Sequence, residues 1–233
     1  MTETIREIAF DTETTGLRWD DDDRIIEMGA VELINYVPTG NTFQAYINPG
    51  RSVSEATIRI TGITDDDLKD KPGFEDPSIV DAFLEFVGDA TIVAHNASFD
   101  RGFLNMELAR AGREIIPEER WVDTVMMARK RYPGAPASLD ALCKRFDISL
   151  SSRTLHGALL DSQLLARVYL ELKGGRARAF DFGEAAKTIQ TESGPASSRD
   201  GERPELLTKE EKKAHAEFVE GLGETPIWKN YAV

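Results

Sequence analysis

The order of the predicted elements changes part-way along the chain, and this change restricts the fold more than any other feature. Three strand-like runs come first, at residues 7–13, 24–33 and 42–47, and turn-forming residues 38–41 separate the last two. Runs connected in this way favour an antiparallel meander. From residue 77 onward helical patterns alternate with short strands, so we expect an α/β domain.

The second part of the chain carries the predicted helices. Pro77 and Ser78 open the first, which Gly88 ends. The next begins near Phe99, ends before Gly112 and has an apolar side made by Phe99, Phe103, Met106 and Leu108. Further helices are expected at 124–132, 138–146 and 161–172, and short strands at 91–94 and 121–125.

Beyond Gly174 and Gly175 the periodic pattern fades, and we place the end of the folded domain at residue 178. Residues 179–207 have the Ser, Gly, Pro and charge content of a flexible linker. Residues 208–233 regain a helical pattern and end with apolar side chains at Ile227, Trp228 and Tyr231. A short tail that exposes aromatic side chains typically needs a partner to bury them, so we expect a docking segment there.

Composition excludes several classes of protein. No run approaches the roughly 18 apolar residues of a membrane-spanning helix, and the first residues lack the apolar block of a signal peptide, so we expect a cytoplasmic protein without membrane contact. The single cysteine, Cys143, allows neither a disulfide nor a thiolate metal site. The net charge of -13 argues against tight, independent binding of nucleic acid.

Two carboxylates mark the end of the first predicted strand. Asp11 and Glu13 are two residues apart and therefore project from one face, while Phe10 and Thr12 project from the other. Adjacent acids repel each other unless a cation or hydrogen bonds hold them. Incidental acids at a solvated strand end are an equally good explanation of this pair alone.

Three further residues are candidates for the same chemistry. Asp100 follows the strand that ends at His95, although the helix dipole alone favours an acid at that position. His156 and Asp161 are five residues apart, which does not place them on one face of a regular helix. We therefore expect His156 in the segment leading into a helix and Asp161 within that helix. His95 is as well explained by packing as by a contact with substrate.

Three stretches together resemble the motifs of the DEDDh exonuclease family: FDTETTGL the first motif, HNASFD the second and HGALLD the third, in the family's order. The resemblance covers residues 5–172. It implies a ribonuclease-H-like fold with a five-stranded mixed sheet flanked by helices. It also implies an enzyme that removes nucleotides from a 3′ end by two-metal-ion hydrolysis.

The resemblance also implies residue roles. Asp11 would bridge two metal ions, Glu13 and Asp161 would complete the first metal site, and Asp100 would reach the second. His156 would be the general base that takes a proton from the attacking water. Carboxylate ligands without cysteine suit Mg2+ or Mn2+ better than zinc.

Contacts that position the terminal nucleotide are implied at four positions close to the acids of the first two motifs: Thr15, Leu17, His95 and Asn96. A hydroxyl can bond to the 3′ end, and an apolar side chain can wedge beside the last base, without reading sequence. Turn and packing chemistry explains the same residues equally well. One departure from the family lies at Thr61, where members often carry histidine.

The segment ARKRYPGAPASLDALCKRFDI resembles the segment between the second and third motifs in the epsilon subunits of bacterial DNA polymerase III. These subunits are a proofreading branch of the family. This resemblance implies a frayed DNA 3′ end as substrate and the polymerase alpha subunit as partner of tail 208–233. The resemblance does not decide whether a theta-like subunit also binds. Residues 174–180 match a sliding-clamp-binding segment poorly, so we do not predict clamp binding. A free-standing, ribonuclease T-like enzyme acting on RNA and a non-catalytic polymerase subunit are the alternatives.

Overall fold

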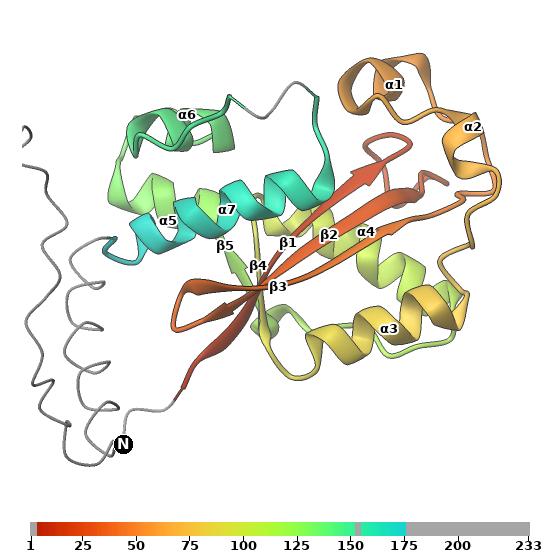
Figure 1. The fold of residues 1–233 in the computed structure, drawn as a ribbon, viewed down its shortest axis with the longest axis horizontal. Coiled ribbons are helices and arrows are strands. Elements are labelled where there is room, and N and C mark those ends of the chain that lie inside the picture. Colours follow the sequence, from red (N-terminus) through yellow and green to blue (C-terminus); the bar gives the residue numbers. More distant parts are fainter. Residues whose placement is uncertain (1–3, 152–154, 176–233) are drawn as a thin grey trace, which may run out of the picture. The chain divides into compact units, whose positions relative to one another are not determined.

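The computed structural model describes residues 4–151 and 155–175, which form a five-stranded sheet covered by helices (Figure 1). The strands stand in the order β3-β2-β1-β4-β5. Their bounds are β1 Arg6–Thr14, β2 Ile25–Ile34, β3 Val37–Tyr46, β4 Thr91–Ala94 and β5 Trp121–Asp123. β1, β2 and β3 pair antiparallel, whereas β4 pairs parallel with both β1 and β5. The predicted meander and mixed sheet are confirmed.

The turn expected at residues 38–41 is wrong, because these residues belong to β3. The chain reverses instead at Asn35 and Tyr36, between the paired residues Ile34 and Val37. Both turn residues have positive φ, 52° and 72°, which is the geometry of a two-residue hairpin whose twist matches its strands. The turn-forming residues misled the prediction because β3 is an exposed edge strand, where polar residues and glycine are tolerated.

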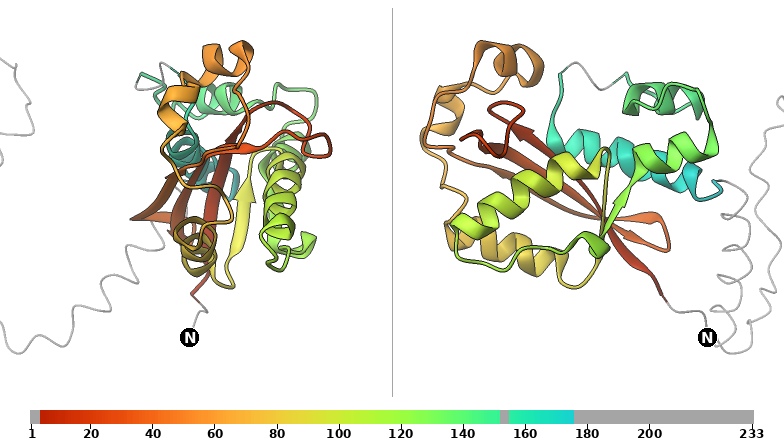
Figure 2. Two further views of the ribbon diagram at one scale, coloured as in Figure 1. Left: turned by 90° about the vertical axis from the view of Figure 1, so that its right-hand side faces the viewer. Right: turned by 180° about the vertical axis from the view of Figure 1, so that it is seen from behind.

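Alternation along β1 builds a core on each face of the sheet. Ile8 and Phe10 face a cluster with α3 (Pro77–Val87) and α4 (Ala97–Arg110). Ala9 faces a second cluster with α6 (Leu139–Arg145) and α7 (Ala158–Leu172). α5 (Thr124–Arg131) contacts α7, and the views in Figure 2 show the helices on both sides of the sheet. β1 is therefore the central, doubly covered strand that both layers share.

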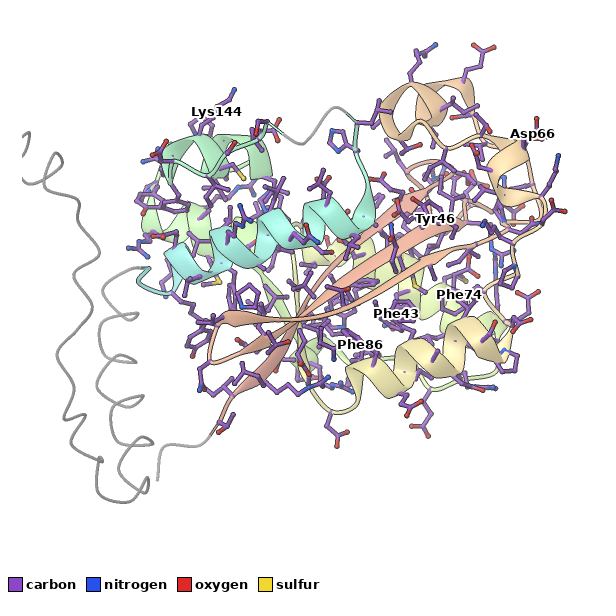
Figure 3. The ribbon with its side chains drawn as sticks, in the orientation of Figure 1. Phe43, Tyr46, Asp66, Phe74, Phe86 and Lys144 are labelled. Carbon is purple, nitrogen blue, oxygen red and sulfur yellow. The ribbon has the colours of Figure 1, made fainter. Side chains whose placement is uncertain are left out.

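Aromatic rings fill the space between the sheet and α3. Phe43 of β3 lies 5.5 Å from Phe83 and 5.9 Å from Phe86, measured between ring centroids. Figure 3 labels Phe43 and Phe86 in this layer. Phe10 completes the group at 5.2 Å from Phe83, so aromatic packing fixes α3 across β1 and β3.

Two short helices between β3 and α3 were not predicted, α1 (Glu55–Thr61) and α2 (Asp65–Leu68). Each is too short to show a helical repeat, but each begins at a capping residue, Ser54 and Thr64. A 3-10 turn, Glu118–Arg120, leads into β5.

The apolar side predicted for α4 is partly wrong. Leu104 is buried, whereas Met106 is half-buried. The difference follows from Glu107, which occupies the core side of the helix and is only 2% exposed. Its carboxylate accepts two hydrogen bonds from the Arg24 guanidinium, at 2.5 and 2.7 Å, and this buried pair joins α4 to the start of β2.

None of the helices in the described ranges is long and apolar enough to cross a membrane. The predicted domain end at residue 178, linker 179–207 and docking tail 208–233 lie outside the described residues, so they stay predictions.

Candidate active site

The two sides of β1 divide the predicted site residues between them. Asp11 and Glu13 continue the face of Ala9, which α7 covers. Thr12 continues the face of Phe10, which α4 covers. β4 pairs with β1 only along Glu7–Ala9, so the last part of β1 extends beyond its parallel neighbour. The carboxylates therefore stand at the carboxyl end of the central strand, where helices from both faces reach them.

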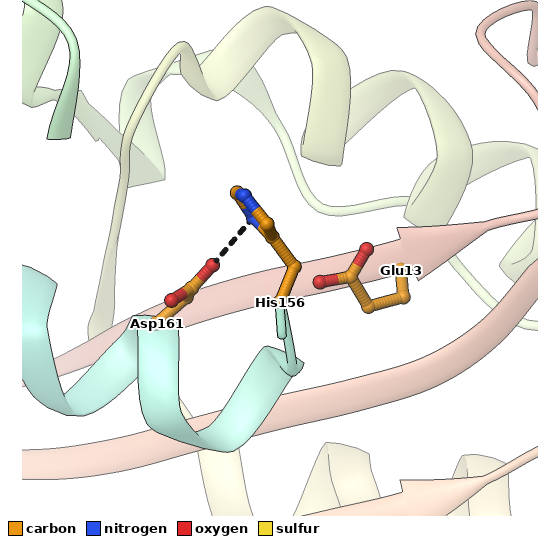
Figure 4. A group of neighbouring side chains, drawn as sticks. All are labelled: Glu13, His156 and Asp161. Carbon is orange, nitrogen blue, oxygen red and sulfur yellow. Dashed lines mark ion pairs between the residues drawn. The ribbon is translucent and has the colours of Figure 1, made fainter. Parts of the chain in front are cut away.

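Glu13, His156 and Asp161 form the tightest group of candidate metal ligands in the described part of the chain. One ligand atom from each lies within 4.8 Å of the others. His156 Nδ1 lies 3.2 Å from Asp161 Oδ2, and Figure 4 shows the Glu13 carboxylate beside this pair. Asp161 is 3% exposed, whereas the His156 side chain is 49% exposed. The acid is therefore held in place while the histidine is open to solvent.

Asp11 and Asp100 lie outside that group but adjoin it. Asp11 lines the same cavity, about 310 Å³, as His156 and Asp161. Asp100 is 3% exposed on α4 and accepts a hydrogen bond of 2.8 Å from the Thr12 hydroxyl. Burial raises the pKa of Asp100 from 3.8 to about 7, and the hydrogen bond from Thr12 opposes this rise. A nearby cation would restore the ionised form.

The start of α7 is fixed by two residues of β2. The buried Glu27 carboxylate accepts a hydrogen bond of 3.0 Å from the Ala158 amide, at the first turn of α7. Gly29 lies directly under the helix, since a Cβ there would be 2.2 Å from the Ala158 carbonyl carbon and the Leu159 nitrogen. The Ser162 hydroxyl donates to the Gly29 carbonyl at 2.8 Å. Only a glycine allows the helix to sit this close.

His156 precedes α7 rather than lying within it. The helix begins at Ala158 with Gly157 as its N-cap, three residues before the predicted start at Asp161. The expectation that His156 leads into the helix and that Asp161 lies within it is confirmed. The backbone amide of His156 donates to the Ile60 carbonyl at 3.1 Å, so α1 holds the segment. This extended approach explains how residues five apart meet.

A mainly apolar cavity of about 290 Å³ adjoins Glu13. Leu17, Ile60 and Phe99 line it together with Thr61 at the end of α1. Leu17 is 82% exposed and stands free at the rim, as a side chain that wedges beside a base would. The cavity places an apolar surface next to the carboxylate group.

The other predicted substrate contacts differ in how free their side chains are. The Thr15 hydroxyl donates to Asp23 and accepts from the Arg24 amide, so it closes the loop after β1. His95 Nδ1 lies 2.9 Å from the Thr124 hydroxyl, and burial lowers the pKa of His95 below 6.5, which keeps the ring neutral at pH 7. Asn96 is exposed with φ of 70°.

These residues fit divalent metal ions. Carboxylate oxygens are the donors that hard cations prefer, and the acids come from three elements, β1, α4 and α7, that converge on one end of β1. Holding several such acids at low exposure is unfavourable without a compensating positive charge. The donor set therefore favours metal binding here.

Comparison with known proteins identifies the family. The RNase T family model, described as Exonuclease, matches residues 8–169. The chain belongs to this exonuclease family. DNA polymerase III subunit epsilon of Rickettsia felis is 44% identical over 95% of the chain and 98% of its own length. The protein of that name from Salmonella typhimurium is 40% identical over 96% of the chain and 97% of its own length.

Solved structures agree with this assignment. Exonuclease X in complex with 5′ overhanging duplex DNA is 30% identical over 72% of the chain and 90% of its own, with a TM-score of 0.56. The nuclease domain of 3′hExo, a DEDDh family member bound to rAMP, has a TM-score of 0.62 at 21% identity, covering 74% of the chain and 94% of its own. The predicted family and the ribonuclease-H-like fold are confirmed.

Sequence reasoning missed the residues that support the site. Glu27 and Gly29 lie in a strand that reads as ordinary β-structure, and only the glycine hints at a close approach. Phe99 was predicted as a helix packing residue, and Ile60 lies in a helix that was not predicted, yet both line the cavity beside Glu13. No local signal separates such residues from core residues.

Replacing Gly29 by alanine should disturb catalysis through α7. The new methyl group would collide with helix backbone, so we expect a loss of about 1–3 kcal/mol in the free energy of unfolding. A displacement of about 1 Å at Asp161 and His156 should lower kcat by roughly 100-fold. Chemical unfolding and a nuclease assay measure the two effects.

Gly40→Ala is the matched control, because its Cβ would meet nothing within 4 Å although φ is 93°. It should cost about 1 kcal/mol of stability through backbone strain and leave kcat near that of the wild type. Wild-type kcat in Gly29→Ala would contradict the role given to this contact.

The raised pKa of Asp100 predicts that the free energy of unfolding depends on pH when metal ions are removed with EDTA. Its folded-state pKa, raised to about 7, lies above the unfolded value, so its contribution is fully present below about pH 4 and is lost as pH rises through about 7. The loss should reach roughly 4 kcal/mol. The Asp100→Asn variant should lack this part of the pH dependence. Mg2+ at pH 8 should stabilise the wild type more than it stabilises this variant. Identical urea-unfolding profiles for both proteins at pH 5 and pH 8 would refute the assignment.

Proposed function

We propose that the chain is a 3′-to-5′ exonuclease that removes mispaired 3′-terminal nucleotides from DNA and releases nucleoside 5′-monophosphates, as the proofreading epsilon subunit of DNA polymerase III. The observation that carries this proposal is the group of Glu13, His156 and Asp161 beside an apolar cavity, in a chain more than 40% identical to epsilon subunits over nearly its whole length. Its place of action would be the cytoplasm.

The catalytic roles proposed are those of two-metal-ion hydrolysis. Asp11, Glu13 and Asp161 hold one metal, Asp11 and Asp100 the other. Two such ions, Mg2+ or Mn2+, stabilise the charge on the attacking and leaving oxygens. His156 is close enough to Asp161 to act at the same centre, and its 49% exposed ring can reach a water there.

The neighbouring cavity accounts for preference for a frayed end. Leu17 and Phe99 offer an apolar surface to the terminal base, and neither side chain carries a group that distinguishes one base from another. Cleavage would then depend on whether the last base has left the duplex and packs against this surface. His95 lines the cavity that holds Asp11, His156 and Asp161, and His95 and Asn96 together line the cavity next to it.

The decisive experiment follows monophosphate release from 3′-labelled DNA primers with a paired or a mismatched end, in Mg2+ or EDTA, with an RNA strand in parallel. We expect metal-dependent release that favours the mismatch. Asp11→Ala should lower kcat by at least about 100-fold while circular dichroism and the melting temperature stay near wild type. Cleavage of RNA alone would indicate a ribonuclease T-like enzyme. No cleavage with any metal would indicate a non-catalytic subunit.

The tail is proposed as the segment that docks on the polymerase alpha subunit, by virtue of its aromatic residues and its position after a linker. Deleting residues 190–233 should leave exonuclease activity intact and abolish co-elution with the alpha subunit. Co-elution of the shortened protein would rule this out. A theta-like third subunit can be tested in the same experiment, and clamp binding is not proposed.

A further inference from the structure

A second, larger cavity of about 830 Å³ adjoins the cavity that holds Asp11, His156 and Asp161. His95, Asn96 and Ser98 line it from the start of α4, and Met126 and Arg129 line it from α5. Its volume lies within the range of roughly 300–1,000 Å³ that is typical of ligand sites. None of the substrate contacts predicted from the sequence explains the α5 side of this cavity.

This cavity continues the active site. His95 and Ser138 line both it and the cavity that holds Asp11, His156 and Asp161. The apolar cavity with Leu17 and Phe99 adjoins Glu13 instead. Asp11 and Asp161 therefore lie next to the larger compartment, whereas Glu13 lies in the apolar compartment proposed for the terminal base. A strand cleaved at the carboxylates would occupy both.

Arg129 supplies a positive charge to the larger compartment. Its side chain is exposed, and within the described ranges no ion pair or hydrogen bond to protein is found for its guanidinium. Two other arginines are engaged: Arg131 donates to the carbonyls of Glu171 and Leu172, and Arg101 pairs with Glu118. An uncommitted cation beside the site stands out in a chain with a net charge of -13.

The remaining lining suits a nucleotide strand. Met126 lies three residues before Arg129, on the same side of α5, and is 62% exposed. A flexible, exposed methionine is a surface against which varied flat groups can pack. Asp123 contributes a carboxylate, but its Oδ1 accepts hydrogen bonds from the Val125 and Met126 amides and so caps α5.

We propose that this cavity is a subsite for single-stranded DNA on the 5′ side of the scissile bond. Arg129 contacts a backbone phosphate there and Met126 packs against a base. The inference rests on the proposed exonuclease function and deepens it: the enzyme grips the strand upstream of the nucleotide that it removes. Neither contact reads base identity, which suits an enzyme that must accept any sequence.

Two substrates separate this subsite from the catalytic centre. Oligothymidylate extends upstream, whereas the p-nitrophenyl ester of thymidine 5′-monophosphate ends at the leaving group. Arg129→Ala should lower kcat/KM for the oligonucleotide, relative to the ester, by roughly 3- to 20-fold, mainly through KM. The salt dependence of oligonucleotide KM should become shallower by about 0.7 on a log-log scale, as for one lost phosphate contact.

Lys130→Ala is the matched control, because it removes the same charge from the next position of α5, which does not line the cavity. Lys130→Ala should change neither the ratio of kcat/KM between oligonucleotide and ester nor the salt dependence of the oligonucleotide KM. An equal effect of both variants, or an unchanged ratio in Arg129→Ala, would overturn the proposal.

Direct binding distinguishes failure of the subsite from failure of the proposed function. The anisotropy of a 5′-labelled oligothymidylate in EDTA should show weaker binding to Arg129→Ala than to wild type and Lys130→Ala. Equal binding by all three would overturn the subsite even in an active enzyme. A wild-type protein that hydrolyses neither substrate would reject the exonuclease function, while anisotropy would still decide whether Arg129 binds the strand.

Discussion

The contact between the first turn of α7 and the middle of β2 is the constraint on which the site depends. Gly29 lets the helix backbone rest on the sheet, and Glu27 satisfies an amide that the helix itself cannot satisfy. Because Asp161 is in this turn and His156 immediately precedes it, the packing distance between helix and strand sets the positions of both. Apolar burial elsewhere along α7 supplies stability, but this contact supplies the geometry.

The acids of the site approach the end of β1 from both faces of the strand. Asp11 and Glu13 face α7, whereas Asp100 comes from α4 and meets Thr12 on the opposite face. The Thr12 hydroxyl offsets part of the cost of burying the Asp100 carboxylate, although burial still raises the pKa of that group. A cation at the end of β1 would favour the ionised form of acids from both layers.

The antiparallel meander and the family can be predicted from the sequence because their signals are local: strand-like runs close together in the chain and three motifs in fixed order. The predicted turn at 38–41 failed because an exposed edge strand tolerates turn-forming residues. The core side of α4 was partly misjudged because Glu107 is buried by a pair with a distant arginine. Glu27 and Gly29 escaped notice because their importance arises from a helix more than a hundred residues away.

The long sequence separation between β1 and α7 has a consequence during synthesis. Asp11 and Glu13 leave the ribosome early, but Asp161 and the helix that carries it are among the last parts of the domain to emerge. A chain made only as far as residue 151 has the candidate ligands Asp11, Glu13 and Asp100 but neither His156 nor Asp161. Nuclease activity would therefore begin only once the whole domain has been made and folded, which keeps nascent or truncated chains from degrading the DNA around them.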